Sequence, residues 1–87
     1  MAAKTFIAAD VRFTRNEAIA ADSLKVHDVW IARVGGDKVT LYQHLTCRLT
    51  SWEVVNPAGY ILAGGNGRNR KESAEKGVAF ASTRVGA

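Results

Sequence analysis

The 87-residue chain has little of several residue types, and each shortage excludes a class of protein. Its single cysteine, Cys47, cannot form a disulfide within the chain, so a reducing compartment such as the cytoplasm is expected. No apolar run approaches the ~18 residues that a membrane-spanning helix needs. The N-terminal segment reaches Asp10 too soon for a secretory signal peptide. We therefore expect one cytoplasmic domain over residues 1–87 that has no membrane partner.

Residues suited to catalysis or metal binding are also scarce. His27 is isolated, and His44 and Cys47 are three positions apart, which places them on opposite faces of a strand. No paired carboxylates or nucleophile–base–orienter arrangement can be recognised. We expect a protein that is not an enzyme and that needs no cofactor or metal, with Cys47 as a small core residue.

Positive charge, by contrast, is concentrated in one region. The formal net charge is +4, and residues 45–87 carry six cations against three anions, whereas residues 1–44 carry six against five. Most of the excess lies in the stretch GGNGRNRKES, residues 64–73, and just after it. A basic surface of this kind suits the phosphates of a nucleic acid or an acidic protein surface.

The first third of the chain has the patterns of a strand and a short helix. Residues 5–13 alternate in polarity, with the apolar side chains mainly at odd positions, which predicts one strand. Thr14 followed by Glu17 matches a capping box, in which each side chain satisfies a free backbone N–H group. This spacing predicts a short helix that ends near Ser23.

Residues 29–45 predict a β-hairpin around a Gly36-Asp37 turn, because glycine accepts positive φ at the first central position. The predicted pairs are Val34 with Val39, Ala32 with Leu41, and Trp30 with Gln43. The second strand is expected to continue to Leu49. Its apolar face would carry Val39, Leu41, Leu45, Cys47 and Leu49, and its polar face Thr40, Tyr42, His44, Thr46 and Arg48.

A second hairpin is predicted around Asn56-Pro57-Ala58-Gly59, because proline at the second position and glycine at the fourth are typical of a type I turn closed by a bulge. It pairs Asn56 with Tyr60, Val54 with Leu62, and Trp52 with Gly64. The glycine leaves room for the indole. Trp30 and Trp52 are most simply interpreted as core residues.

The C-terminal region predicts a helix that begins after Asn69, a favourable N-cap residue. Glu72 and Lys76 form an i,i+4 pair in the favoured orientation. A stripe of small buried side chains is expected at Ala74, Gly77, Val78 and Ala81. The predicted fold class is α+β: a small antiparallel sheet of about four to five strands with the C-terminal helix packed on one face.

The start of this helix is the main candidate site. Its unpaired N–H groups favour an anion, and Arg68, Arg70 and Lys71 add positive charge that we expect to face solvent. Cations in a first helical turn oppose the helix dipole unless an anion compensates them, and this conflict is the best local argument for a phosphate site. A solvated loop with ordinary surface cations is the simpler interpretation, and a protein interface is the third. The spacing of the glycines does not match a Walker loop.

A second candidate surface is the polar strand face. Tyr42, His44 and Arg48 could stack on bases or contact a protein there, although an ordinary solvated face with cross-strand pairs is the simpler interpretation. The candidate nucleic-acid-binding residues are therefore Arg68, Asn69, Arg70, Lys71, Lys76, Arg48 and Tyr42.

Residues 50–82 resemble the last strand and final helix of double-stranded-RNA-binding domains. That family has a glycine-x-glycine-x-serine-lysine-lysine pattern before an alanine-rich helix, and its places are taken by Gly65, Gly67, Asn69, Arg70 and Lys71. The resemblance implies that cations at the helix start grip phosphates across the major groove of an A-form duplex. The upstream half departs from the family, because its proline-glycine-x-histidine loop is absent.

We therefore predict a small non-enzymatic module that binds the phosphates of RNA or DNA through a basic helix start. The alternative is a small phage- or plasmid-type inhibitor or adaptor protein that binds an acidic protein surface through its basic face or a sheet edge. A homodimer is compatible with either function, because a chain this short without disulfides has a limited core.

Overall fold

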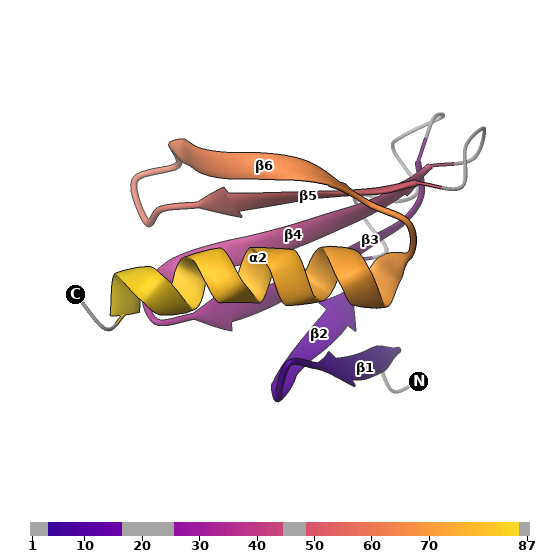
Figure 1. Cartoon of the computed structure of the whole chain (residues 1–87), viewed down its shortest axis with the longest axis horizontal. Helices are drawn as coiled ribbons and strands as arrows, with labels where there is room; N and C mark the ends of the chain where they lie inside the picture. Colours follow the sequence, from indigo (N-terminus) through magenta and orange to yellow (C-terminus); the bar gives the residue numbers. More distant parts are fainter. Residues whose placement is uncertain (1–3, 17–25, 45–48, 86–87) are drawn as a thin grey trace.

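The computed structural model describes residues 4–16, 26–44 and 49–85, which form a six-stranded antiparallel sheet and one long helix (Figure 1). The strands lie side by side in the order of the sequence. The elements are β1 (Thr5–Ala8), β2 (Val11–Arg15), β3 (Val26–Val34), β4 (Asp37–His44), β5 (Thr50–Val55), β6 (Ile61–Gly67) and α2 (Arg70–Val85). The α+β class with a C-terminal helix is confirmed, whereas the predicted strand count of four to five was too low.

The additional strand comes from residues 5–13, which form a hairpin and not one strand. Ala9 and Asp10 take positive φ values of 51° and 61°, and the chain reverses there so that Phe6 pairs with Phe13. Two positive φ values suit a tight hairpin turn, but alanine rarely adopts them, so the sequence pattern concealed the turn. The reversal also turns Phe6 and Phe13 toward the same face.

The predicted helix start at Thr14 is wrong. Thr14 and Arg15 belong to β2, where they pair with Ile31 and Trp30 of β3. The capping pattern was outweighed because the strand contacts bury Phe13 completely. The rest of that predicted helix, including Glu17 and Ser23, lies outside the described residues.

The β3–β4 hairpin is confirmed, but its register differs by two residues. Val34 pairs with Asp37, Ala32 with Val39 and Trp30 with Leu41, so the turn is Gly35-Gly36, with Gly35 at a φ of 62°. A shift of two keeps every side chain on its predicted face.

A long-range contact accompanies the observed register. It places Asp37 in the sheet, 5% exposed, where its Oδ2 accepts a hydrogen bond of 2.7 Å from Arg84 Nε at the end of α2. β4 is described as far as His44. Leu49, which is 44% exposed, does not extend it as predicted, because the next residue, Thr50, already pairs back with Gln43. Cys47 lies outside the described residues.

The β5–β6 hairpin has the predicted turn. Gly59 N donates to Asn56 O at 2.9 Å, Gly59 has a φ of 94°, and Asn56 lies opposite Tyr60. A bulge next to Val54 and Val55 then shifts the pairing by one residue, so Trp52 lies opposite Gly65 instead of Gly64. A Cβ on Gly65 would lie 3.0 Å from Trp52 Nε1, so the indole occupies the space over a glycine as expected.

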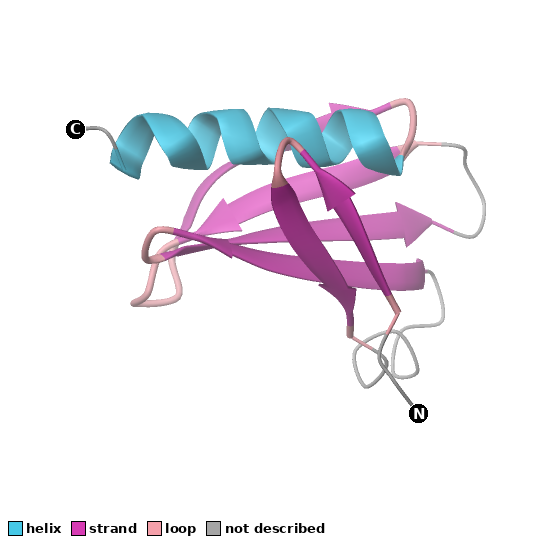
Figure 2. Ribbon diagram, turned by 90° about the horizontal axis from the view of Figure 1, so that it is seen from below, coloured by secondary structure: helices cyan, strands magenta, loops and turns pink. Residues whose placement is uncertain are grey.

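Helix α2 lies along one face of the sheet (Figure 2), and no membrane-crossing helix of sufficient length and apolarity occurs in the described part of the chain. The predicted stripe is confirmed, because all of its residues are buried. Gly77 lets the helix approach β4 closely, since a Cβ there would lie 2.6 Å from Val39 Cγ1. The core is formed where α2 meets Trp30, Val39, Leu41 and Val54.

Candidate phosphate-binding site at the helix start

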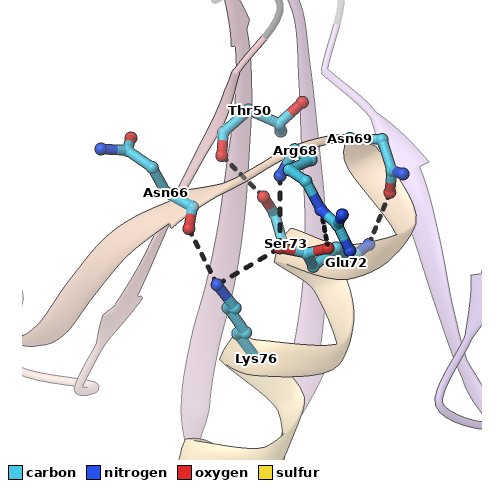
Figure 3. Close-up of polar contacts among 7 residues, drawn as sticks. All are labelled: Thr50, Asn66, Arg68, Asn69, Glu72, Ser73 and Lys76. Atoms are coloured by element: carbon cyan, nitrogen blue, oxygen red, sulfur yellow. Dashed lines mark hydrogen bonds and ion pairs between the residues drawn. The ribbon is translucent and has the colours of Figure 1, made fainter.

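The start of α2 is held by the predicted N-cap. Asn69 Oδ1 accepts a hydrogen bond of 2.8 Å from the backbone N–H group of Glu72 (Figure 3). One residue later, the hydroxyl of Ser73 donates to Thr50 O of β5 at 2.6 Å, and Ser73 is fully buried. The helix start is thus fixed to the sheet and not only to the preceding loop.

Glu72 partly neutralises the basic turn. Its Oε2 accepts a hydrogen bond of 3.0 Å from Arg68 Nε, and its Oε1 lies 3.4 Å from Lys76 Nζ (Figure 3). These contacts, that from the Arg68 side chain first, lower the pKa of Glu72 below its ordinary value. Glu72 is therefore ionised at neutral pH and sits between two cations. The predicted Glu72–Lys76 pair is confirmed, but the competing contact with Arg68 was not predicted.

Arg70 was predicted to face solvent, and this prediction is wrong. Its guanidinium lies 4.0 Å from the ring centroid of Phe6 and 4.5 Å from that of Trp30. Phe6 in turn stacks on Phe13 with a centroid separation of 5.1 Å and meets Trp30 edge-on at 5.0 Å. The cation is drawn onto the aromatic faces because their quadrupole attracts it and the methylene stem covers apolar surface. Arg70 is thus a packing residue first.

We predict that Arg70→Ala lowers the free energy of unfolding by about 1 kcal/mol, because the two cation–π contacts and the buried stem are lost. Urea denaturation measures the change. Lys71→Ala is the matched control, since Lys71 is exposed, and its effect should stay within about 0.5 kcal/mol. Equal losses in the two variants would contradict the structural role of Arg70.

Lys71 is the cation of the helix start whose ammonium group stays available to a ligand. It is exposed and makes no hydrogen bond or ion pair with any described residue. It borders an open pocket of about 660 Å³, whose other walls include Phe6, Ile7, Gln43 and Asn69. Gln43 Oε1 accepts from Trp30 Nε1 at 2.9 Å, which directs the amide nitrogen of Gln43 away from the indole. The pocket therefore combines an apolar wall with hydrogen-bond donors.

One carboxylate also lines the pocket. Asp28 accepts a hydrogen bond from Arg15 Nε, and the two side chains form an ion pair. Because Arg15 compensates its charge, Asp28 does not cancel the positive charge of Lys71. The open part of the pocket rim is consequently electropositive.

The polar strand face behaves as the simpler interpretation expects. Tyr42 Oη donates to Glu53 Oε1 at 2.6 Å, and burial, followed by this hydrogen bond, raises the pKa of the Tyr42 hydroxyl. His44 Nε2 lies 2.7 Å from Ser51 Oγ, which donates to Asn66 Oδ1 at 2.8 Å. These are cross-strand pairs. Tyr42 faces away from Leu41 and the helix, so it does not join the basic turn.

Of the predicted site residues, the structure brings together Arg68, Asn69, Arg70, Lys71 and Lys76, while Arg48 lies outside the described residues. Phe6, Gln43 and Asp28 were not predicted, and no local pattern identifies them, because they come from three other strands. The role of Glu72 could have been found, since it stands three residues after Asn69 as in a capping box. No family model, curated protein or solved structure matches the chain.

Proposed function

We propose that the chain is a non-enzymatic nucleic-acid-binding module that holds backbone phosphates at the start of α2. The observation that carries the proposal is the exposed Lys71 ammonium beside the open end of the helix. The first N–H groups of a helix lack intrahelical acceptors, and Asn69 takes that of Glu72 only. The N–H groups of Arg70 and Lys71 are left to bind an anion.

Arg68 is the second residue that would contact phosphate. Its side chain is 86% exposed, and its ion pair with Glu72 is exposed to solvent and therefore contributes little stability. A phosphate presents several charged oxygens, so it can replace the Glu72 carboxylate as the partner of the Arg68 guanidinium at little cost in free energy. Lys76 is less available, because its ammonium also donates to Asn66 O at 3.1 Å.

The resemblance to double-stranded-RNA-binding domains supports the same site and favours an A-form duplex. β6 leads through a short turn into the capped helix, as the resemblance implies for Gly65 to Lys71. The two cations that would meet phosphate differ from the expected pair, because Arg70 covers Phe6 and Trp30. We therefore assign the contacts to Arg68 and Lys71.

The test is a titration of labelled duplex RNA, duplex DNA and single strands at several salt concentrations. We expect affinity to fall steeply with salt, with a slope of about −0.9 per contacted phosphate on duplex DNA. The double variant Arg68→Ala/Lys71→Ala should make that slope shallower by the equivalent of about two phosphate contacts. It should weaken binding to all nucleic-acid sequences to the same extent.

A matched control removes the same charge elsewhere. Arg12 and Arg33 are exposed cations on β2 and β3, so Arg12→Ala/Arg33→Ala lowers the net charge equally without touching the helix start. This control should keep the salt slope of the wild type. If both double variants lose affinity equally, binding reflects net charge alone and the assigned site is wrong.

A further inference from the structure

β6 is an open edge of the sheet. It pairs with β5 on one side, and no described strand lies on its other side (Figure 1). An edge strand presents unpaired backbone N–H and C=O groups, and proteins usually protect it with charged side chains, proline or a bulge. Protection is sparse here. The stretch from Tyr60 to Gly67 contains no charged residue and no proline.

Two devices shield this edge, and both act near its ends. One is the bulge opposite Val54 and Val55, close to Ile61. The other is Lys76, whose Nζ donates to Asn66 O at 3.1 Å. Lys76 is half-exposed and also forms an ion pair with Glu72. A backbone N–H group of another strand can therefore replace it as the donor to Asn66 O.

The edge also carries exposed apolar surface. Tyr60 is 71% exposed and Ile61 is 66% exposed. Beyond them, Gly64 and Gly65 are exposed and have no side chains that could keep a neighbouring strand away. The first half of the strand therefore carries bulky side chains, and the second half carries two exposed glycines.

This asymmetry makes the strand complementary to its own copy. If two β6 strands pair antiparallel, Tyr60 and Ile61 of each chain lie against the glycines of the other. A parallel pair would set the bulky residues against each other. Because the stretch has no charge, self-pairing also places no like charges opposite one another.

We propose that two chains form a dimer by antiparallel pairing of their β6 strands across a two-fold axis perpendicular to the sheet. The sheet then runs continuously through both chains, with the two α2 helices on the same face. Such an interface is isologous and closed, so no third chain can add at β6. The two helix starts lie at opposite ends of the paired strands, because each follows its own Gly67.

The opposite edge is a poorer candidate for this contact. β1 belongs to a hairpin that crosses the other strands steeply (Figure 2). Pairing β6 with β1 of another chain would be a head-to-tail contact, which leaves an edge free on each chain and builds a larger ring or a filament. The two edges therefore predict different particle sizes, which makes the proposal testable without reference to nucleic acid.

The test is sedimentation equilibrium of the full chain from micromolar to near-millimolar concentration. The wild type should reach twice the mass of one chain and no more. Ile61→Lys should weaken the dimer by at least about tenfold, because it removes the apolar contact with the glycine half of the partner strand and places a charged side chain on the pairing edge. Ile7→Lys is the matched control: Ile7 is 64% exposed on the β1 edge, and the dimer should persist.

Hydrogen exchange gives a second readout that does not depend on a substitution. The amides of the β6 edge should gain protection as the wild type is concentrated, whereas Ile61→Lys should keep the exchange of the dilute protein. A wild type that stays monomeric at all concentrations would overturn the proposal. So would open-ended assembly, or a dimer that Ile7→Lys disrupts and Ile61→Lys does not.

Discussion

Gly67→Ala should lower the free energy of unfolding by about 3 kcal/mol, the upper end of the usual cost of overpacking. Gly67 is buried beneath the first turn of α2. A methyl group there would overlap Ser73 Oγ, and it would lie 2.8 Å from Ser73 N and 3.1 Å from Ser73 Cα. Two of these are main-chain atoms, so a side-chain rotation cannot relieve the overlap.

The helix also has little freedom to move away from β6. The Ser73 hydroxyl donates to Thr50 O, and Ser73 has no exposed surface. Lifting the helix would leave that buried carbonyl without its side-chain donor. Alanine lowers the conformational entropy of the unfolded chain, but this gain offsets at most about 1 kcal/mol of the expected destabilisation.

Urea denaturation followed by circular dichroism measures the effect of Gly67→Ala. Gly36→Ala is the control, because a Cβ at Gly36 would meet only Pro57 Cγ, at an ordinary 3.4 Å, so the change should stay within about 0.5 kcal/mol. Because Gly67 positions the helix start, the folded Gly67→Ala protein should also bind nucleic acid more weakly. Equal stability of the two glycine variants would contradict the close approach of α2 to β6.

Phe13→Ala should destabilise the protein by about 3–5 kcal/mol. Phe13 is fully buried in β2, where it stacks on Phe6, and it belongs to the core cluster that includes Trp30. Its removal deletes the largest fully buried side chain among the described residues and leaves a cavity under the hairpin. The loss should also free Phe6, which supports the guanidinium of Arg70.

The measurement is again urea denaturation, with near-ultraviolet circular dichroism to report the aromatic packing. Phe13→Leu keeps most of the volume and should cost less, which preserves a folded protein for comparison. Ile7→Ala, on the exposed side of the same hairpin, should change stability by no more than about 0.5 kcal/mol. A Phe13→Ala loss as small as that of Ile7→Ala would mean that the hairpin does not contribute to the core.

The accuracy of the sequence-based predictions depended on how far apart the interacting residues are. Asn69 as N-cap and the turn from Asn56 to Gly59 were predicted correctly, because each depends on residues within four positions. The Ala9-Asp10 turn was missed, because its positive φ values are unusual for alanine and are held by strand pairing. The β3–β4 register was wrong because two adjacent glycine-containing turns were available.

In the candidate site, too, the features set by neighbouring residues were predicted and those set by distant contacts were not. The sequence located the capped helix start and the cations around it, including Arg68 and Lys71, because they are adjacent in the chain. It could not separate their roles. Arg70 packs on Phe6 and Trp30, which are 64 and 40 positions earlier in the numbering, and only the folded sheet brings those rings beneath the helix.

Local residue order was thus sufficient for the α+β class, the apolar faces of β3 and β4, the C-terminal helix and its cap. Side-chain alternation, capping and turn geometry act over a few residues and leave a readable pattern. Tertiary structure decided the split of residues 5–13 into two strands, the pairing registers, and which cation is packed and which is open. Those outcomes depend on contacts between distant segments, whose energies compete with local preference and outweigh it.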